Sequence, residues 1–188
     1  MHIRKLAPPD REPVLAVLRS DGTFQIDEVD VAMELVDDVI ARPDVDYSAL
    51  VCEDAAAGRV LGYVCYGFTP MTTGTYDLYW IATHREARGR GVATRLVQAM
   101  EQKLGAAGAR IVRIETSQSE AYGAARSFYA RLGYAEVGRI RDFYKPGDDL
   151  ITFAKSLDER AGKLRPVSVP DPSAPGAPRL RTPTATTS

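Results

Sequence analysis

The sequence predicts a single α/β domain with a mixed, mostly antiparallel central sheet flanked by helices. Three observations support this fold class. The 188 residues are enough for one ordinary domain with a hydrophobic core. Short runs rich in strand-forming residues fill the middle and the end of the domain, whereas amphipathic runs with helical spacing lie before and between them. Together these runs give the order β-α-α-β-β-β-α-β-α-β-β.

The first 43 residues predict one strand and two helices. Residues 3–6 form a short strand, and the turn Pro8-Pro9-Asp10 starts a first helix with apolar residues at 14–18. A second helix follows Asp27 and stops before Pro43. One face of this helix is apolar, and the other carries four carboxylates, Asp30, Glu34, Asp37 and Asp38. We interpret the acidic face as solvated surface.

The rest of the domain predicts alternating strands and helices. Three strands joined by turns rich in Gly, Pro and Thr form an antiparallel meander, at residues 47–53, 60–68 and 75–83. Two amphipathic helices follow, each ended by a glycine, at 91–104 and 121–132. The remaining strands lie at 110–115, 135–144 and 150–154. The helix at 121–132 is expected to bury Ala121, Ala125, Phe128 and Leu132.

The domain is expected to span residues 1–158. Residues 159–188 form a tail that consists mainly of Pro, Ser, Thr, Ala and Gly from about residue 164 onward. Such a composition cannot bury enough apolar surface to offset the entropy of ordering the chain. We therefore expect the tail to be largely disordered.

Charge and cysteine use exclude several classes of function. The formal net charge is −1 with both signs spread along the chain, so nothing favours nucleic acid or a membrane as the main partner. Cys52 and Cys65 lie in apolar strand-like runs without metal-ligand spacing, which fits a reducing compartment. The N-terminus has no apolar leader run, and no stretch is long enough to span a bilayer. We expect a cytoplasmic protein without a bound metal, and the sequence is compatible with a homodimer.

The most informative segment is a glycine- and arginine-rich turn that joins a strand to a helix. The strand 77–83 leads to Arg88-Gly89-Arg90-Gly91-Val92-Ala93, where an amphipathic helix begins. Helix N-termini expose unpaired N–H groups and the positive end of the helix dipole. The glycines let the backbone approach a phosphate closely, and the two arginines add positive charge. The turn therefore predicts an anion site, with the small residues Ala93 and Thr94 beside it.

Three interpretations of this turn compete. The simplest is a tight loop whose arginines point to solvent. A second is a dinucleotide site, because Gly89, Gly91 and Thr94 follow a strand and Glu115 ends the next strand, where a ribose-binding acid would lie. The missing third glycine, the two arginines and the position after an antiparallel meander all weigh against it. The third interpretation comes from a family resemblance.

Residues 88–93 match R-x-x-G-x-A, the acetyl-CoA signature of the GCN5-related N-acetyltransferases (GNAT), and the element order of residues 1–158 resembles that of the family. The resemblance implies the acyl-CoA N-acyltransferase fold with acetyl-CoA as co-substrate. It also implies that backbone N–H groups of the turn hold the pyrophosphate, while the backbone of residues 81–83 pairs with pantetheine. The cofactor-binding residues are then Ile81, Ala82, Thr83, Arg88, Gly89, Arg90, Gly91, Val92, Ala93 and Thr94.

A second motif lies at the expected distance from the first. Residues 125–134, with the sequence ARSFYARLGY, resemble the A-x-x-x-Y-x-x-x-G-F segment of the family. One position departs from the family pattern, since many members have an asparagine seven residues before the tyrosine and this chain has Tyr122. We include Tyr122 among the cofactor-binding residues, where it either stacks on pantetheine or packs.

Acetyl transfer requires a neutral amine, a polarised carbonyl and a proton for the departing thiolate. Tyr129 is the candidate acid because it directly follows the apolar Phe128 on the buried side of its helix. An alkylammonium has a pKa near ~10.4, so a base is useful at neutral pH. Asp77 is the candidate base, with an ordinary ion pair as the competing interpretation. Strand alternation places four residues on one face, Thr75, Asp77, Tyr79 and Ile81.

The predicted function is direct transfer of an acetyl group from acetyl-CoA to a primary amine of an unidentified small molecule or peptide, in a ternary complex. If the acidic face of the second helix borders the acceptor cleft, Glu34 and Asp37 would favour a cationic acceptor. The alternative from another class is a module that binds acyl-CoA without turnover, because folds host functions and do not dictate them.

Overall fold

The computed structural model describes residues 1–158 and residue 164, so nearly all of the predicted tail lies outside the described residues. Its helices are α1 (Arg11–Asp21), α2 (Ile26–Ala41), α3 (Val92–Ala106) and α4 (Gly123–Arg131). Its strands are β1 (His2–Lys5), β2 (Tyr47–Asp54), β3 (Arg59–Phe68), β4 (Thr75–Thr83), β5 (Ile111–Ser117), β6 (Ala135–Lys145) and β7 (Asp148–Ser156). The predicted order of elements is confirmed.

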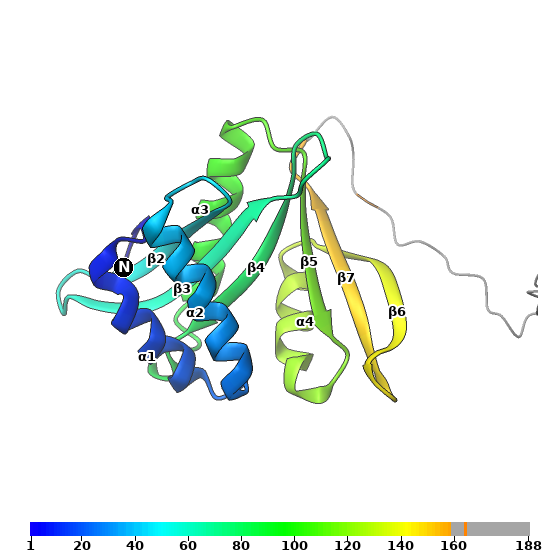
Figure 1. Cartoon of the computed structure of the whole chain (residues 1–188), viewed down its shortest axis with the longest axis horizontal. Coiled ribbons are helices and arrows are strands. Elements are labelled where there is room, and N and C mark those ends of the chain that lie inside the picture. Colours follow the sequence, from blue (N-terminus) through cyan, green and yellow to red (C-terminus); the bar gives the residue numbers. More distant parts are fainter. Residues whose placement is uncertain (159–163, 165–188) are drawn as a thin grey trace, which may run out of the picture.

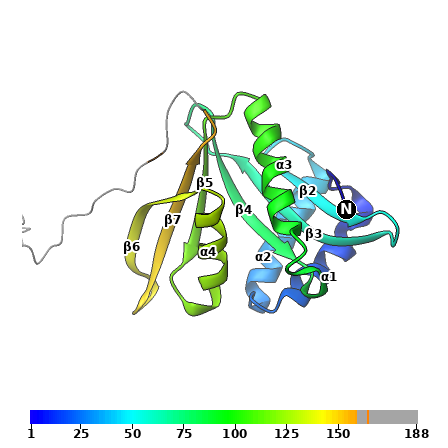
Figure 2. The ribbon, with the colours of Figure 1, turned by 180° about the vertical axis from the view of Figure 1, so that it is seen from behind.

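The helices cover the two faces of one sheet, with α1 and α2 on one side (Figure 1) and α3 and α4 on the other (Figure 2). Each side has its own buried core. Val14, Leu18 and Val36 belong to the core under α1 and α2, whereas Leu96 and Met100 belong to the core under α3 and α4. The apolar spacing along each helix explains this burial, because residues three or four apart share a face. The sandwich of helices around a sheet matches the predicted fold class.

The strand order of the sheet is β1-β2-β3-β4-β5-β7-β6. Strands β2, β3 and β4 form the predicted antiparallel meander, and the pairing of β4 with β5 is parallel. That parallel pairing covers only Thr75–Leu78 of β4 and Ile111–Ile114 of β5. Beyond it the two strands diverge, as Figure 1 shows, and residues 79–83 and 115–117 are not paired with each other. The divergence opens the middle of the sheet.

A β-bulge lies in β4 where the divergence begins. Cys65 of β3 pairs with Trp80, and the next residue, Tyr66, pairs with Leu78, so Tyr79 is an extra residue without a partner in this ladder. A bulge interrupts the alternation of side chains and redirects them. Leu78 and Ile81 consequently pack against the same core, although strict alternation would put them on opposite faces. The predicted common face of Asp77, Tyr79 and Ile81 is therefore wrong.

Smaller differences concern the segment before α4. Residues Glu120–Tyr122 form a short 3-10 turn, so α4 begins at Gly123, two residues later than predicted. Ala121 is exposed instead of buried, because it belongs to that turn, and the most deeply buried residue of α4 is Tyr129. No helix within the described residues is long and apolar enough to cross a membrane.

Candidate active site

The diverging strands form one wall each of a cavity of about 1130 Å³. Its lining comes from six parts of the chain: the α1–α2 connection with the start of α2, the end of β4, the turn before α3, the end of β5, the segment from residue 119 to α4, and the β6–β7 hairpin. Most of these segments are far apart in the sequence. The cavity exists because β4 and β5 separate after Leu78 and Ile114.

The turn before α3 presents a group of free backbone donors. Gly89 and Gly91 have φ angles of 74° and 78°, a left-handed conformation that favours glycine. The N–H groups of Arg88 and Arg90 donate within the turn, each at 3.3 Å, to the carbonyls of Arg85 and Ala87. Among the described residues, no backbone acceptor is bonded to the N–H groups of Gly89, Gly91, Val92, Ala93 and Thr94. These donors and the N-terminus of α3 can hold an anion such as a diphosphate.

The two arginine side chains are arranged differently from the prediction. The Arg88 guanidinium donates to the Asp21 carbonyl at 2.6 Å and lies 3.0 Å from the Asp21 carboxylate. Arg90 is half-exposed, lies 3.9 Å from Asp54, and is not part of the cavity lining. Arg88 thus ties the turn to the end of α1. The turn therefore offers an anion its backbone N–H groups and not free guanidinium groups.

The cofactor-binding residues predicted on β4 and near α4 also reach the cavity. Ile81, Ala82 and Thr83 line it, and no strand among the described residues pairs there with the edge of β4 that faces away from β3. Such an edge can pair with the amides of an extended ligand, as an added strand would. Tyr122 also lines the cavity, and its hydroxyl donates to the carboxylate of Glu28 at the start of α2. This hydrogen bond links two lining segments that are 94 residues apart in the sequence.

Tyr129 has the position expected of an acid inside the site. Its side chain lines the cavity and is 5% exposed, with its ring against Phe128, Tyr134 and Phe153. Burial raises the pKa of the Tyr129 hydroxyl well above its usual range, so the group keeps its proton at neutral pH. No residue in the described part of the chain forms a hydrogen bond with this hydroxyl. It is free to donate to a ligand.

Asp77 lies outside the cavity. Its carboxylate accepts hydrogen bonds from Arg113 at 2.5 Å and from the Thr69 hydroxyl at 2.8 Å, and the residue is buried. It is not among the lining residues, because it belongs to the part of β4 that still pairs with β5. This geometry is that of a structural ion pair, so the base role predicted for Asp77 has no support from its position.

Other carboxylates, which the sequence did not single out as catalytic, do line the cavity. Glu115 at the end of β5 is one of them, and it also accepts a hydrogen bond from Arg113 at 3.1 Å. Glu28 and Asp148 reach the same space from α2 and β7. The predicted acidic residues Glu34 and Asp37 are exposed and not part of the lining, and Asp37 is paired with Arg11 at 2.7 Å. Its position at the end of a predicted strand could have suggested Glu115 as a candidate site residue.

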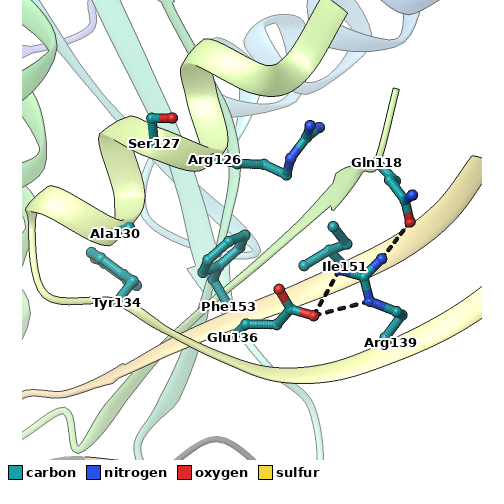
Figure 3. A pocket seen from close by; sticks show the side chains of 9 residues that line it. All are labelled: Gln118, Arg126, Ser127, Ala130, Tyr134, Glu136, Arg139, Ile151 and Phe153. Atoms are coloured by element: carbon teal, nitrogen blue, oxygen red, sulfur yellow. Dashed lines mark hydrogen bonds and ion pairs between the residues drawn. The ribbon is translucent and has the colours of Figure 1, made fainter. Parts of the chain in front are cut away.

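A second hollow of about 540 Å³ lies between α4 and the β6–β7 pair (Figure 3). Its charged side chains are already engaged. Arg139 contacts Glu136, Asp149 and Gln118, while Arg126 donates to two backbone carbonyls at 2.7 and 2.8 Å. A ligand would have to compete with all of these contacts, so we assign the chemistry to the larger cavity.

Comparisons with known proteins agree with this geometry. A family model described as the acetyltransferase (GNAT) domain matches residues 46–136. An uncharacterized N-acetyltransferase of Methanocaldococcus jannaschii is 30% identical over 108 residues, which cover 57% of this chain and 66% of that relative, just under two thirds. A crystal structure of a protein assigned to the GNAT family, from Desulfovibrio desulfuricans, is 34% identical with a TM-score of 0.79, over 84% of this chain and 99% of the other. The chain belongs to the GNAT family of acetyltransferases.

Family membership confirms the predicted fold, the class of enzyme and acetyl-CoA as the co-substrate. A structure of an aminoglycoside 6'-N-acetyltransferase complexed with coenzyme A shares the fold with a TM-score of 0.68 and 19% identity, over 84% of this chain and 98% of the other. The cavity of this GNAT protein suits such a co-substrate. It offers free N–H groups for a diphosphate at α3 and a free strand edge for pantetheine amides on β4.

Proposed function

We propose that this GNAT protein transfers an acetyl group from acetyl-CoA directly to a primary amine within a ternary complex. One observation carries the proposal: a single cavity reaches the α3 turn at Arg88 and Ala93, the end of β4, and the hydroxyl of Tyr129, which has no partner in the described part of the chain. A donor held along this path brings its thioester to the Tyr129 hydroxyl. Carboxylates of Glu28, Glu115 and Asp148 line the same cavity, where an amine would be attracted to them.

The proposed reaction uses two side chains of the cavity. The neutral amine attacks the thioester carbonyl, a carbon–nitrogen bond forms, and the carbon–sulfur bond breaks. Glu115 takes the proton that the amine loses, directly or through a water, and the Tyr129 hydroxyl protonates the departing thiolate. We assign the base role to Glu115 instead of Asp77, because Glu115 lines the cavity and Asp77 is occupied by Arg113 and Thr69.

Initial-velocity measurements test direct transfer. If both substrates must be bound before reaction, reciprocal plots at several fixed amine concentrations should intersect. Parallel lines would indicate a covalent acetyl-enzyme intermediate and would contradict the ternary complex. A cytoplasmic location stays a prediction, with which the two free and buried thiols Cys52 and Cys65 are compatible.

Two matched amide substitutions distinguish the candidate bases. Glu115→Gln should lower kcat by about 10²-fold with little change in melting temperature, because general-base catalysis typically contributes 10²–10⁴-fold. Asp77→Asn should instead lower stability by about 1–2 kcal/mol, because a buried ion pair is weakened, and should leave kcat of the folded protein nearly unchanged. Steady-state kinetics and thermal unfolding of both variants measure this. The opposite pattern would return the base role to Asp77.

A further inference from the structure

Three carboxylates line the cavity together with Tyr144 of the β6–β7 hairpin. Glu28 comes from the start of α2, Glu115 from the end of β5 and Asp148 from the start of β7. Burial raises the pKa of Tyr144, and the negative charges of these three carboxylates raise it further. Segments that are distant in the sequence therefore contribute negative charge to the same cavity.

Two of the three carboxylates have no cationic partner among the described residues. Asp148 is 7% exposed, and it accepts hydrogen bonds from the Ser117 hydroxyl at 2.5 Å and the Ser119 N–H at 3.2 Å. Glu28 accepts from the Gln25 N–H at 2.7 Å and from the Tyr122 hydroxyl. These neutral donors fix the carboxylates in position without cancelling their charge. Asp148 is buried and Glu28 is partly buried, and a carboxylate removed from water is costly unless a cation accompanies it, which a ligand can supply.

The charge balance of the whole lining points the same way. It contains five carboxylates, from Asp21, Asp27, Glu28, Glu115 and Asp148, and two cations, from Arg88 and Lys145, so its formal charge is −3. Arg88 is already bound to Asp21. A concave surface with one sign of charge raises the local concentration of ligands with the opposite sign.

Aromatic rings also line the cavity. Phe24 and Trp80 pack with their ring centroids 6.0 Å apart, and both line it together with Tyr122 and Tyr144. The face of an aromatic ring attracts an alkylammonium group, most strongly where water is excluded. Carboxylates and aromatic rings together are therefore suited to an organic cation more than to a metal ion or a neutral molecule.

We propose that the acceptor is an amine with a second amino group that stays protonated at neutral pH, and that Glu28 and Asp148 hold this second ammonium group while the reacting amine lies beside Glu115. The proposal rests on the acetyl transfer proposed above and narrows its substrate class. A separate cation is required because the reacting amine must lose its own proton before attack. The same carboxylates repel an acidic acceptor, and an acceptor with a neutral group in place of the second ammonium gains no charge attraction from them.

Three acceptors of nearly equal length test the proposal. They are 1,5-diaminopentane, 5-aminopentanol and 5-aminopentanoate, which carry a positive, a neutral and a negative group opposite the reacting amine. We expect kcat/KM with acetyl-CoA to be at least about tenfold higher for the diamine than for the amino alcohol, and lowest for the amino acid. The preference should shrink at high salt. Equal values for the diamine and the amino alcohol would overturn the proposal.

Charge-removing variants identify the residues responsible. Glu28→Gln retains a side-chain acceptor for Tyr122 but removes the charge, so kcat/KM should fall about tenfold for the diamine and change less than about twofold for the amino alcohol. If Asp148→Asn folds, its kcat/KM should likewise fall for the diamine and stay nearly unchanged for the amino alcohol. If it does not fold, Glu28→Gln alone tests the proposal. Glu34→Gln is the matched control, because Glu34 is an exposed carboxylate of the same helix outside the cavity. An equal loss for both amines in Glu28→Gln would contradict the proposal.

A binding measurement separates this proposal from the proposed reaction. Trp80 is the single tryptophan of the chain and lines the cavity, so its fluorescence reports ligand binding without turnover. With coenzyme A present, 1,5-diaminopentane should bind at least about tenfold more tightly than 5-aminopentanol. Tighter diamine binding without acetylation would refute the reaction and support the cation site. Acetylation of both amines with equal affinity would support the reaction and refute the cation site.

Discussion

Replacing Tyr129 by phenylalanine should lower kcat by about 10³-fold while the dissociation constant for acetyl-CoA changes by less than about threefold, because proton transfer and not binding is lost. The hydroxyl has no hydrogen-bond partner in the described part of the chain, so its removal should leave folding stability nearly intact. Stopped-flow detection of the released thiol and calorimetric titration of acetyl-CoA measure the two effects separately.

Tyr134→Phe provides the matched control for this experiment. Tyr134 is also buried, and its ring centroid lies 6.1 Å from that of Tyr129, but its hydroxyl donates to Glu101 at 2.8 Å and it does not line the cavity. Its loss should cost about 1 kcal/mol of stability and leave kcat unchanged. Equal rates for Tyr129→Phe and the wild-type protein would remove Tyr129 from the chemistry.

Replacing Ala93 by glutamate should weaken acetyl-CoA binding by about 10³-fold. Ala93 lines the cavity at the second position of α3, among the free N–H groups of the turn. A carboxylate there would occupy these donors and repel the diphosphate, and two unit charges at about 4 Å near a protein surface interact with about 4 kcal/mol. The same carboxylate should slightly stabilise the free protein, because an acidic residue near a helix N-terminus is favourable.

The opposite signs of these two effects make the Ala93 test specific. A variant that had merely lost its fold would lose stability and binding together. Gln98→Glu adds the same charge on an exposed position of α3 outside the cavity and should leave affinity within about twofold of the wild type, because solvent screens it. Unchanged acetyl-CoA affinity in Ala93→Glu would contradict the assignment of the diphosphate to this turn.

The parts of the fold that follow local rules could be predicted from the sequence. The helices and strands occur in the expected order because each is predicted by a pattern of apolar residues that lies within one short stretch of sequence. The Gly89 and Gly91 turn was recognisable for the same reason, since both glycines adopt positive φ angles next to a helix N-terminus. Tyr129 followed from its place in a short motif and from the apolar residue before it.

Long-range contacts decided the features that the sequence did not reveal. Asp77 was predicted to be the base, but in the fold its carboxylate is paired with Arg113. Arg88 was predicted to add positive charge to the anion site, but its guanidinium is paired with Asp21 at the end of α1. The bulge at Tyr79 depends on how β3 and β4 are paired, which no local pattern encodes. Glu28 gained its importance only through contact with Tyr122, 94 residues away.

The central claim is that the cavity between β4 and β5 passes an acetyl group from acetyl-CoA to an amine. Its most direct test is to incubate the protein with acetyl-CoA and 1,5-diaminopentane and to quantify free thiol and N-acetylated amine in the same samples. We expect thiol release that depends on the amine, one acetylated product for each thiol released, and neither in Ala93→Glu. Acetyl-CoA binding by calorimetry without amine-dependent thiol release, for any amine of a broad panel, would contradict the claim and indicate a module that only binds the cofactor.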